Sequence, residues 1–233
     1  MGFPVSTTKT LTLRSTETTA EHAAIYAVRG GAYRAVGKRL LDLTMIILIL
    51  PIVLPVIAMV TLALLVAGHS PFYSQKRLGR GGRVFRIWKF QTMHPEADKM
   101  LAALLEADPA RRAEWQSTQK LKQDPRITRI GSYLRKTSID ELPQLWNVLK
   151  GDMSLLGPRP MMPDQKHLYG PAFPVYASLR PGISGMWQVS ERNESHFQRR
   201  AELDIQYARD LSLATDLRLV WQTLRTVLYS TGY

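Results

Sequence analysis

Cysteine is absent from the 233-residue sequence, and histidine is scarce. Without cysteine the chain forms no disulfide and no thiolate metal site, and a reducing compartment is allowed but not established. The five histidines are scattered along the chain, and no two of them have the spacing of zinc ligands. The composition therefore argues against a zinc enzyme and against a disulfide-stabilised scaffold.

Acidic residues are also few. The chain has 19 aspartates and glutamates against 31 lysines and arginines, so the formal net charge is +12 and the pI is about 10.1. A chain with this charge is expected to bind anionic partners, which include nucleic acid, acidic lipid headgroups and phosphorylated substrates. The charge alone does not choose among these three.

Charged residues are entirely missing from residues 43–75, and within this segment the run 45–66 has Thr61 as its one polar residue. The 22 residues of the run are about the length needed to cross a bilayer core. A secretory signal peptide fits poorly, because 44 residues precede the run and no small-residue cleavage site follows it. The run therefore predicts a membrane helix.

Basic residues flank the apolar run on both sides. The positive-inside rule would place both flanks in the cytoplasm, which a simple span does not allow. Pro51 and Pro55 offer a solution, because each removes a helix hydrogen bond and kinks the backbone, so that the helix could enter one leaflet and return. On the residues alone, a re-entrant helix and a kinked single-pass anchor both stay open. The flanking charges are Arg29, Arg34, Lys38 and Arg39 before the run and Lys76, Arg77, Arg80 and Arg83 after it.

Residues 72–93 predict a basic β-hairpin. Stretches of strand-like composition flank "GRGG", whose glycines suit a turn, and no acidic residue lies between positions 71 and 95. A hairpin that rests on anionic headgroups is the favoured interpretation, and a phosphate-binding face is the alternative. The glycines do not form a Walker loop, because the Gly-Lys-Ser/Thr ending is missing.

Helices are predicted directly after the hairpin and in the tail. Residues 96–123 predict two short helices broken at Pro109, and the tail predicts helices over about 198–209 and 214–229 with apolar stripes. The tail helices could pack on the core, lie at a membrane interface or form an oligomer contact. Residues 1–30 are rich in Thr and Ser with weak periodicity, and we expect them to be disordered.

The stretch "SIDE" (138–141) contains two adjacent carboxylates. Ser138 followed three residues later by Glu141 matches a capping box, and acidic residues in a first helical turn suit the helix dipole. The pattern predicts a helix that begins at Thr137 or Ser138 and ends at Gly151. Its apolar face would consist of Leu142, Leu145, Trp146 and Leu149.

Cations surround this acidic pair in the sequence. Arg126, Arg129, Arg135 and Lys136 precede it, and "GPRP" holds Arg159 between two prolines. Prolines restrict their neighbours to extended conformations, so this loop would present one guanidinium rigidly, which suits bidentate phosphate binding. A surface arginine in a proline-rich turn is the simpler alternative.

Several long motifs resemble those of the bacterial sugar transferase family, the monotopic polyprenyl-phosphate phosphoglycosyl transferases. The motifs are "KRLLDL", the proline-broken apolar run, "KFQTM", "LRKTSIDELPQLWNVLKGDMSLLGPRP" and "RPGISGMWQVSERN", and they occur in the family's order over roughly residues 34–233. The tail also resembles that of family members that initiate exopolysaccharide synthesis as galactose or glucose phosphotransferases.

The resemblance implies a reaction. A UDP-sugar would give its sugar 1-phosphate, with galactose or glucose as the sugar, to undecaprenyl phosphate, and UMP would leave. Asp140 aligns with the family's nucleophile, which forms an aspartyl phosphosugar, and Glu141 aligns with its partner, which assists proton removal from the lipid phosphate. Mg²⁺ is the implied cofactor with Asp140 as its ligand, and Arg135 and Arg159 align with phosphate contacts.

The resemblance also implies an architecture. The expected fold is α+β and mostly helical. Residues 31–75 would form a re-entrant membrane helix-turn-helix with its kink at Pro51 and Pro55. Residues 76–233 would form a membrane-associated catalytic domain, carrying the short hairpin, on the cytoplasmic face of the bacterial inner membrane. Inner-membrane lipid would then be a partner beside the UDP-sugar and undecaprenyl phosphate.

Three positions depart from the family's pattern. Leu54 replaces the usual Ser before the kinking proline, so a hydroxyl that could satisfy a freed carbonyl is lost. Gln91 stands in "KFQTM" where Arg is usual, which weakens the expectation of a phosphate contact there. Glu191 stands where Gly is common, and the sequence offers no physical account of that change.

Two hypotheses from other classes remain open. The charge, with Tyr73, Phe85 and Trp88 among basic residues, would fit a membrane-tethered nucleic-acid-binding protein, which gives no role to the Asp–Glu pair. A non-catalytic scaffold for polysaccharide enzymes would retain its function when Asp140 is changed. The favoured interpretation expects no nucleic-acid partner and leaves a homo-oligomer open.

Overall fold

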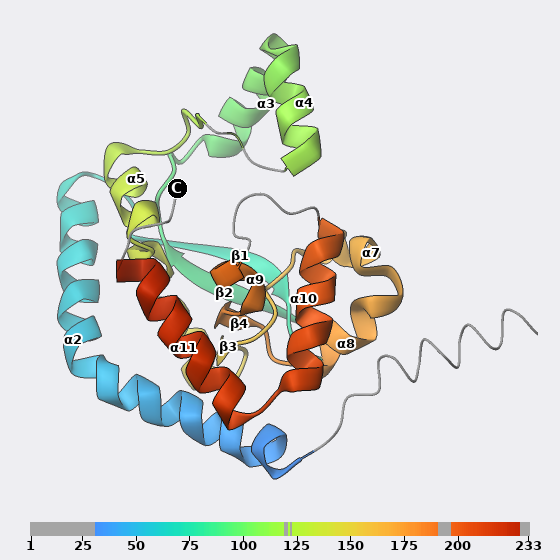
Figure 1. Ribbon diagram of the computed structural model, residues 1–233. Helices are drawn as coiled ribbons and strands as arrows, with labels where there is room; N and C mark the ends of the chain where they lie inside the picture. Colours follow the sequence, from blue (N-terminus) through green and yellow to red (C-terminus); the bar gives the residue numbers. More distant parts are fainter. Residues whose placement is uncertain (1–30, 119–120, 122, 191–196, 229–233) are drawn as a thin grey trace, which may run out of the picture.

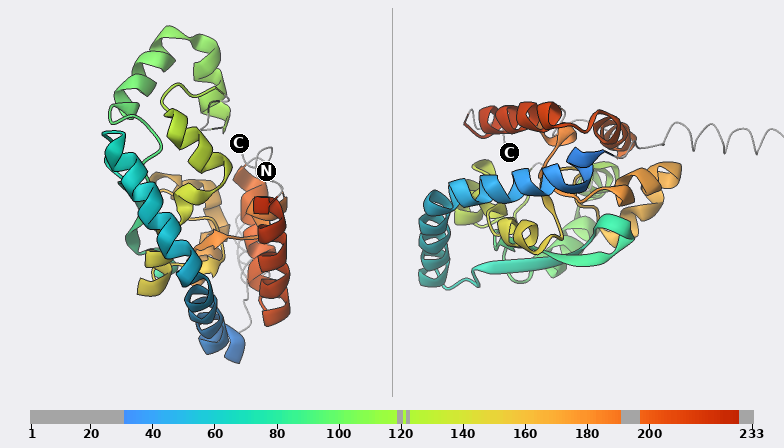
Figure 2. Two further views of the ribbon diagram at one scale, coloured as in Figure 1. Left: turned by 90° about the vertical axis from the view of Figure 1, so that its left-hand side faces the viewer. Right: turned by 90° about the horizontal axis from the view of Figure 1, so that it is seen from below.

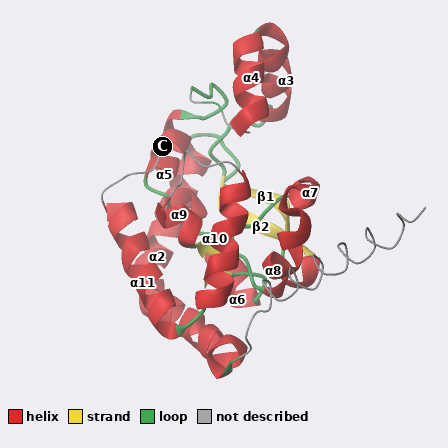
Figure 3. Cartoon of the chain, turned by 45° about the vertical axis from the view of Figure 1, so that its right-hand side comes forward, coloured by secondary structure: helices red, strands yellow, loops and turns green. Residues whose placement is uncertain are grey.

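The computed structural model describes residues 31–118, 121, 123–190 and 197–228. The predicted disorder of residues 1–30 and the departure at Glu191 lie outside the described residues. Helices make up most of the described chain and two small sheets lie among them (Figure 3). The prediction of a mostly helical fold with a short hairpin is confirmed.

The elements follow one another in an irregular order of short helices and shorter strands. Up to the acidic pair they are η1 (Tyr33–Gly37), α2 (Lys38–Val66), β1 (Phe72–Leu78), η2 (Arg80–Gly82), β2 (Val84–Phe90), α3 (Ala97–Ala107), α4 (Pro109–Thr118), α5 (Arg129–Lys136) and η3 (Ile139–Glu141). After it come α6 (Gln144–Lys150), β3 (Ser154–Leu156), η4 (Pro163–Gln165), α7 (Lys166–Tyr169), η5 (Gly170–Ala172), α8 (Phe173–Ser178), β4 (Gly182–Ser184), α9 (Met186–Ser190), α10 (Phe197–Asp210) and α11 (Leu213–Leu228).

The apolar run forms one long helix, α2, which continues the π-helix η1. Pro51 and Pro55 both lie inside it, and Figure 1 shows α2 bending between its blue N-terminal part and its cyan C-terminal part. A proline cannot donate the backbone hydrogen bond of an α-helix and its ring crowds the preceding turn, which accounts for a bend. The predicted helix-turn-helix is therefore a single bent helix, and Tyr33–Val66 is long and apolar enough to cross a membrane.

One side of α2 packs on the rest of the molecule and the other side is bare. Ile46 is fully buried against β2 and α6, and Val60 and Leu64 pack with Phe90 and Leu134. Each buried aliphatic side chain contributes roughly 1.5–3 kcal/mol. The opposite side exposes more than half of each apolar side chain at Ile47, Leu48, Ile52, Leu54, Met59, Leu62 and Val66. An apolar surface of this extent needs a cover other than water.

Polar contacts fasten the first turns of α2. Lys38 Nζ lies 2.8 Å from Asp216 Oδ2 in α11, and the buried Asp42 accepts hydrogen bonds from Ser154 Oγ and Leu155 N at 2.9 and 3.0 Å. Arg39 donates to two carbonyl oxygens at the end of α6. Because the other end of α2 leads directly into β1, both ends of the helix belong to one packed body.

The predicted hairpin consists of β1 and β2, which pair antiparallel from Phe72 with Phe90 to Leu78 with Val84. Its turn requires glycine, because Gly81 and Gly82 have φ of +70° and +72°. Directly paired residues share a face of a sheet. The inward face therefore carries Tyr73, Gln75, Arg77, Phe85, Ile87 and Lys89, and the outward face carries Ser74, Lys76, Arg86 and Trp88.

The two short helices and the tail helices are confirmed. Figure 1 shows α3 and α4 standing apart from the other helices, whereas α10 and α11 cover the side of the molecule next to the N-terminal part of α2 (Figure 2). Tyr207 and Leu219 are buried between these tail helices and the core, so the first of the three open alternatives, packing on the core, holds for one face of these helices. The parallel pair of β3 with β4 was not predicted.

Candidate active site

The sequence predicted Asp140 in the first turn of an α-helix, but the structure places it in a 3₁₀ turn. The turn η3 is followed by a separate helix, α6, and Ser138 before it has a left-handed φ of 59° and makes no capping hydrogen bond through its side chain. The predicted capping box is therefore wrong. A left-handed residue other than glycine costs about 1–3 kcal/mol and persists where the surrounding packing holds it. Here Ile139 and Leu142, on either side of the acidic pair, pack against the C-terminal part of α2.

The helix that follows is shorter than predicted and its apolar face is divided. It ends at Gly151, whose φ of 85° terminates it as expected. Leu145 is buried, but Trp146 and Leu149 are 59% and 38% exposed. In the sequence Trp146 and Leu149 belong to the same apolar pattern as Leu145. The three-dimensional packing buries Leu145 and leaves the other two exposed. The exposed pair adds to the apolar surface of the molecule.

Lys89, on the inward face of β2, lies between the two carboxylates. Its Nζ is 2.7 Å from Glu141 Oε1 and 3.7 Å from Asp140 Oδ2. Burial raises the pKa of Asp140, the positive charge of Lys89 opposes that rise, and the neighbouring Glu141 carboxylate adds to it. The side chain of Asp140 is 10% exposed, so its carboxylate has lost most of its hydration and is held by an ammonium group instead.

Arg135 approaches Asp140 from α5. Its Nε donates a hydrogen bond to Thr92 Oγ1 at 2.9 Å, and burial lowers the pKa of Arg135 while the charge of Asp140 raises it. Gly131, one turn earlier, permits this approach, because a Cβ at that position would overlap the Thr92 carbonyl oxygen. Close contact between α5 and the segment after β2 therefore places Arg135 beside the acidic pair.

Arg159 reaches the same site from the loop after β3. Both flanking prolines are buried, and the guanidinium lies 5.4 Å from the ring centroid of Trp187. Its positive charge is one of those that lower the pKa of Asp140. The structure thus brings Asp140, Glu141, Arg135 and Arg159 together, although the chain separates Arg159 from the other three.

The fit of Mg²⁺ to this site depends on the substrate. Within the part of the chain that the structure describes, no three His, Cys, Asp or Glu side chains form a group that could hold a metal ion. Mg²⁺ often binds through one or two carboxylates and completes its shell with water and substrate phosphates. Asp140 offers one such carboxylate, although Lys89 lies 3.7 Å from the same side chain. The residues therefore offer one carboxylate ligand, and water or phosphate oxygens would have to complete the shell of a bound Mg²⁺.

Sequence reasoning placed Lys89 in a basic hairpin without giving it a role, and it assigned no role to Arg77 or Trp187. The alternation of a strand could have found Lys89, because the buried Ile87 two residues earlier marks the inward face. Gln91, the departure in the same motif, donates to its neighbour Met93 O at 2.7 Å. The aromatic residues of the nucleic-acid hypothesis do not share one face of the hairpin, since Tyr73 and Phe85 lie on one face and Trp88 on the other.

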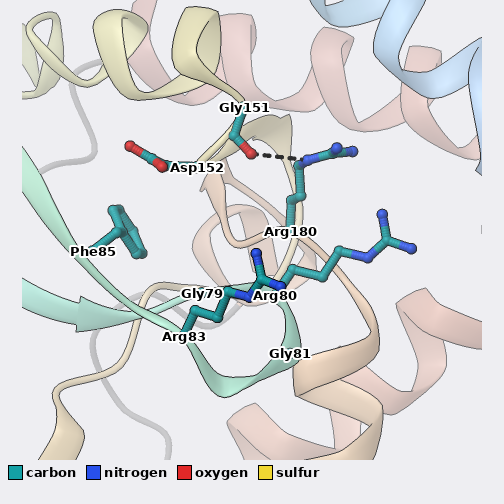
Figure 4. Close-up of a pocket in the computed structure, with 8 residues that line it drawn as sticks. All are labelled: Gly79, Arg80, Gly81, Arg83, Phe85, Gly151, Asp152 and Arg180. Atoms are coloured by element: carbon teal, nitrogen blue, oxygen red, sulfur yellow. Dashed lines mark hydrogen bonds between the residues drawn. The ribbon is translucent and has the colours of Figure 1, made fainter.

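A cavity of about 450 Å³ lies at the other end of the hairpin. It is lined by the turn residues Gly79, Arg80, Gly81 and Arg83, by Phe85, and by Gly151, Asp152 and Arg180. Figure 4 shows Arg180 reaching Gly151, whose carbonyl oxygen accepts a hydrogen bond from Nε at 3.0 Å. Lys89, Asp140 and Glu141 are absent from the lining of this cavity. The cations at the turn of the hairpin and those around the acidic pair therefore form separate regions.

Comparison with known proteins places the chain in a family. The family model described as Bacterial sugar transferase matches residues 33–230, which contain every residue of the acidic site. The chain belongs to the bacterial sugar transferase family. The resemblance in the motifs is thereby confirmed, and the match extends from the start of the apolar helix to the end of the tail helices.

Individual relatives agree with this membership. The exopolysaccharide production protein ExoY of Sinorhizobium fredii is 41% identical over 206 residues, which cover 87% of this chain and 91% of the relative. The UDP-galactose-lipid carrier transferase of Erwinia amylovora and the undecaprenyl-phosphate galactose phosphotransferase of Salmonella typhimurium are each 41% identical over 195 residues, or 84% of this chain. This chain spans only 41% of the length of each of these last two proteins.

Proposed function

We propose that the protein transfers a hexose 1-phosphate, with galactose or glucose as the hexose, from a UDP-sugar to undecaprenyl phosphate and releases UMP. This would be the first membrane step of exopolysaccharide biosynthesis. The observation that carries the proposal is a dehydrated carboxylate, Asp140, held by Lys89 and faced by the charges of Arg135 and Arg159. The names of the relatives, which include a UDP-galactose-lipid carrier transferase and an exopolysaccharide production protein, support it.

In the first half-reaction, a carboxylate oxygen of Asp140 attacks the phosphorus that carries the sugar. A bond forms between that oxygen and phosphorus, the bond from phosphorus to the bridging oxygen breaks, and the bridging oxygen leaves with the electron pair as part of UMP. Arg135 and Arg159 offset the charge of the diphosphate and so lower the cost of bringing an anion to a carboxylate. Mg²⁺, when bound, would supply further charge neutralisation on the diphosphate.

In the second half-reaction, an oxygen of the lipid phosphate attacks the same phosphorus and Asp140 is released as a carboxylate. Glu141 can take the proton that the lipid phosphate loses, because its carboxylate is adjacent in the chain and shares Lys89 with Asp140. The ammonium of Lys89 stabilises the carboxylate that is regenerated. Asp140 thus acts in both halves, and the enzyme returns to its starting state once Glu141 passes its proton to water.

The proposed location is the cytoplasmic face of the bacterial inner membrane, with α2 re-entrant. Polar contacts of Lys38, Arg39 and Asp42 tie the first turns of α2 to the body that its last turn also joins, so a span would have to pull one end away. The exposed apolar side of the bent helix would face the hydrocarbon. Because the C-terminal part of α2 packs against Ile139 and Leu142, the acidic pair would lie close to the depth of lipid phosphates.

A turnover assay tests the proposed function. The full chain, purified in detergent, is given Mg²⁺, undecaprenyl phosphate and one of UDP-galactose, UDP-glucose or UDP-N-acetylglucosamine, and UMP release is measured. We expect sustained release with UDP-galactose or UDP-glucose only when the lipid acceptor is present, because without it each enzyme molecule releases a single UMP. Release with none of the three donors would contradict the proposal, and DNA or RNA binding that weakens steeply with salt would favour the nucleic-acid alternative.

Cysteine labelling tests the topology, and the lack of native cysteine makes every introduced thiol unique. Single variants Gly31→Cys and Arg80→Cys, at exposed positions before α2 and in the hairpin turn, should both be labelled by a polar maleimide only when the cytoplasmic side is accessible. Ile52→Cys, 73% exposed at the bend, should resist the reagent until detergent removes the lipid. Labelling of positions 31 and 80 from opposite sides would show a simple span.

A further inference from the structure

Two arginines from distant parts of the chain lie over the ring of Trp187, and the charges of both act on a third. Arg159 lies 5.4 Å and Arg200 4.3 Å from the centroid of its ring, measured from the guanidinium carbon. Arg77, on the inward face of β1, is close enough to both for their charges to act on it. Trp187 itself is 4% exposed. We call Arg77, Arg159, Arg200 and Trp187 the arginine cluster.

The charges of the arginine cluster oppose one another. Burial first, and then the positive charge of Arg159, lower the pKa of Arg77 to about 10. Burial and the charge of Arg159 likewise lower the pKa of Arg200. Like charges in a partly dehydrated place repel more strongly than they do in water. A bound anion would relieve that repulsion.

Arg77 itself lacks an acidic partner in the described part of the chain. Its Nη2 donates to Gln75 Oε1 at 2.6 Å and its Nη1 to Pro160 O at 3.2 Å, and both acceptors are neutral. Its Nε is buried and has no hydrogen-bond partner among the described residues. A buried donor without an acceptor destabilises the folded protein, because it has lost its hydrogen bonds to water without replacing them. The most economical explanation is an acceptor that arrives with a ligand.

The arginine cluster adjoins the acidic site through Arg159. The charge of Arg159 acts on Asp140 as well as on Arg77 and Arg200. Along the inward face of the hairpin, Arg77 lies four residues from Tyr73, the partner of Lys89, which corresponds to about 13 Å of strand. A basic track therefore runs from the acidic pair past Arg159 to Arg77.

The two ends of this track have different surroundings. Ile139, next to Asp140, packs with Val60 and Leu64 of α2, so a lipid phosphate would enter from the α2 end. Arg77 donates to Pro160 O, and Met161 and Ala201, which follow Pro160 and Arg200 in the chain, belong to a core cluster that takes none of its described members from α2. The arginine cluster thus lies on the side of the site away from the proposed membrane helix, where a water-soluble donor would enter.

We propose that Arg77, together with Arg200, binds the nucleotide phosphate of the donor, the phosphate that departs as UMP. This inference rests on the proposed function. When Asp140 attacks the sugar-bearing phosphorus, the bridging oxygen takes the electron pair of the broken bond, and the departing phosphate gains one negative charge. The Nε and Nη groups of Arg77 are donors at the place where that charge develops, and Arg159 spans the two phosphates.

The test measures UMP binding and donor kinetics in matched variants. Arg77→Gln removes the proposed contact, and Arg86→Gln removes the same charge from the outward face of the same hairpin, where Arg86 donates to Ser74 Oγ. UMP is titrated into the full-length detergent-solubilised protein by calorimetry, which needs no turnover. We expect Arg77→Gln to weaken UMP binding and to raise KM for the UDP-sugar at least tenfold, with KM for undecaprenyl phosphate within twofold of wild type. Arg86→Gln should change none of these values more than twofold.

Several outcomes would overturn the inference. They are a failure of the wild-type protein to bind UMP, equal losses in the two variants, or a rise in KM for the lipid in place of the donor, which would assign the cluster to the lipid phosphate. If Arg77→Gln does not fold, as judged by its melting temperature, Arg77→Lys replaces it and should weaken UMP binding by about threefold, because one point charge remains without the paired donors. If the wild type releases UMP from no donor, the proposed function fails, and the calorimetric titration still decides whether Arg77 binds the nucleotide.

Discussion

The two ends of the hairpin are both basic, and only one of them is built for chemistry. At the turn, Arg80, Arg83 and Arg180 line an open cavity with Asp152 as its one carboxylate. At the open end, Lys89 contacts two carboxylates in a site where burial raises the pKa of Asp140. Both ends carry several cations, but they differ in dehydration and in the arrangement of opposite charges.

This difference shows why the basic composition said so little about function. A cation at the surface attracts any anion, and the salt in solution screens it. A carboxylate that has lost its water and lies near ammonium and guanidinium groups adds little to the stability of the fold, because its dehydration costs free energy. The same carboxylate can act as a nucleophile toward a phosphoryl group. Three sets of variants test this contrast, in order of decreasing expected effect.

The largest effect on activity is expected at Asp140, and Asp152 at the turn of the hairpin is its matched control. Asp140→Asn keeps the size of the side chain and removes its nucleophilic charge, so UMP release should fall by at least about 10³-fold. Asp152→Asn, the matched change at the turn, should stay within about twofold of wild type. Equal activity of Asp140→Asn and wild type would contradict the proposed role and favour a scaffold.

The second-largest loss of activity is expected when Lys89 is changed. Lys89→Met removes the cation that holds both carboxylates, and UMP release should fall on the order of 10²-fold. The reaction needs Asp140 ionised, and the charge of Lys89 opposes the rise of its pKa. The acid limb of the pH–rate profile should therefore move to higher pH in the variant. Lys76→Met on the outward face should leave both the rate and the profile unchanged, and an unshifted limb in Lys89→Met would show that Lys89 does not act on Asp140.

Asp204 is a buried carboxyl outside the proposed catalytic residues, and its titration should change the stability of the protein with pH. Burial raises the pKa of this fully buried carboxyl to about 7, and Tyr169 donates a hydrogen bond to it. Because the folded state holds the proton more tightly than the unfolded state, stability should fall as pH rises from about 4 to 7, by at most about 4 kcal/mol. Asp204→Asn should flatten that slope in thermal unfolding, and a slope equal to that of wild type would show that Asp204 is not its source.

The sequence predicted what local patterns determine. Glycines mark the hairpin turn, Pro109 separates α3 from α4, and the stripes in the tail mark α10 and α11. It missed what depends on packing between distant segments. The capping pattern at Ser138 gave way to a left-handed turn because Ile139 and Leu142 pack on α2.

The site was predicted in part for the same reason. Asp140, Glu141, Arg135 and Arg159 could be named from their motifs, but the position of Lys89 depends on the hairpin register and that of Arg77 on contact with the loop at Pro160. The strands β3 and β4 have three residues each, too few for alternation to show, and their pairing joins segments that are far apart in the chain.

Intact-mass spectrometry of the protein, quenched with acid during turnover, tests the central claim most directly. The full chain is mixed with Mg²⁺ and its UDP-sugar donor in the absence of undecaprenyl phosphate, and the modified peptide is then mapped. We expect a mass increase of one hexose phosphate on the peptide that contains Asp140, its disappearance when the lipid acceptor is added, and its absence in Asp140→Asn. Normal turnover by a wild-type protein that never carries this adduct, or that carries it on another side chain, would contradict the account.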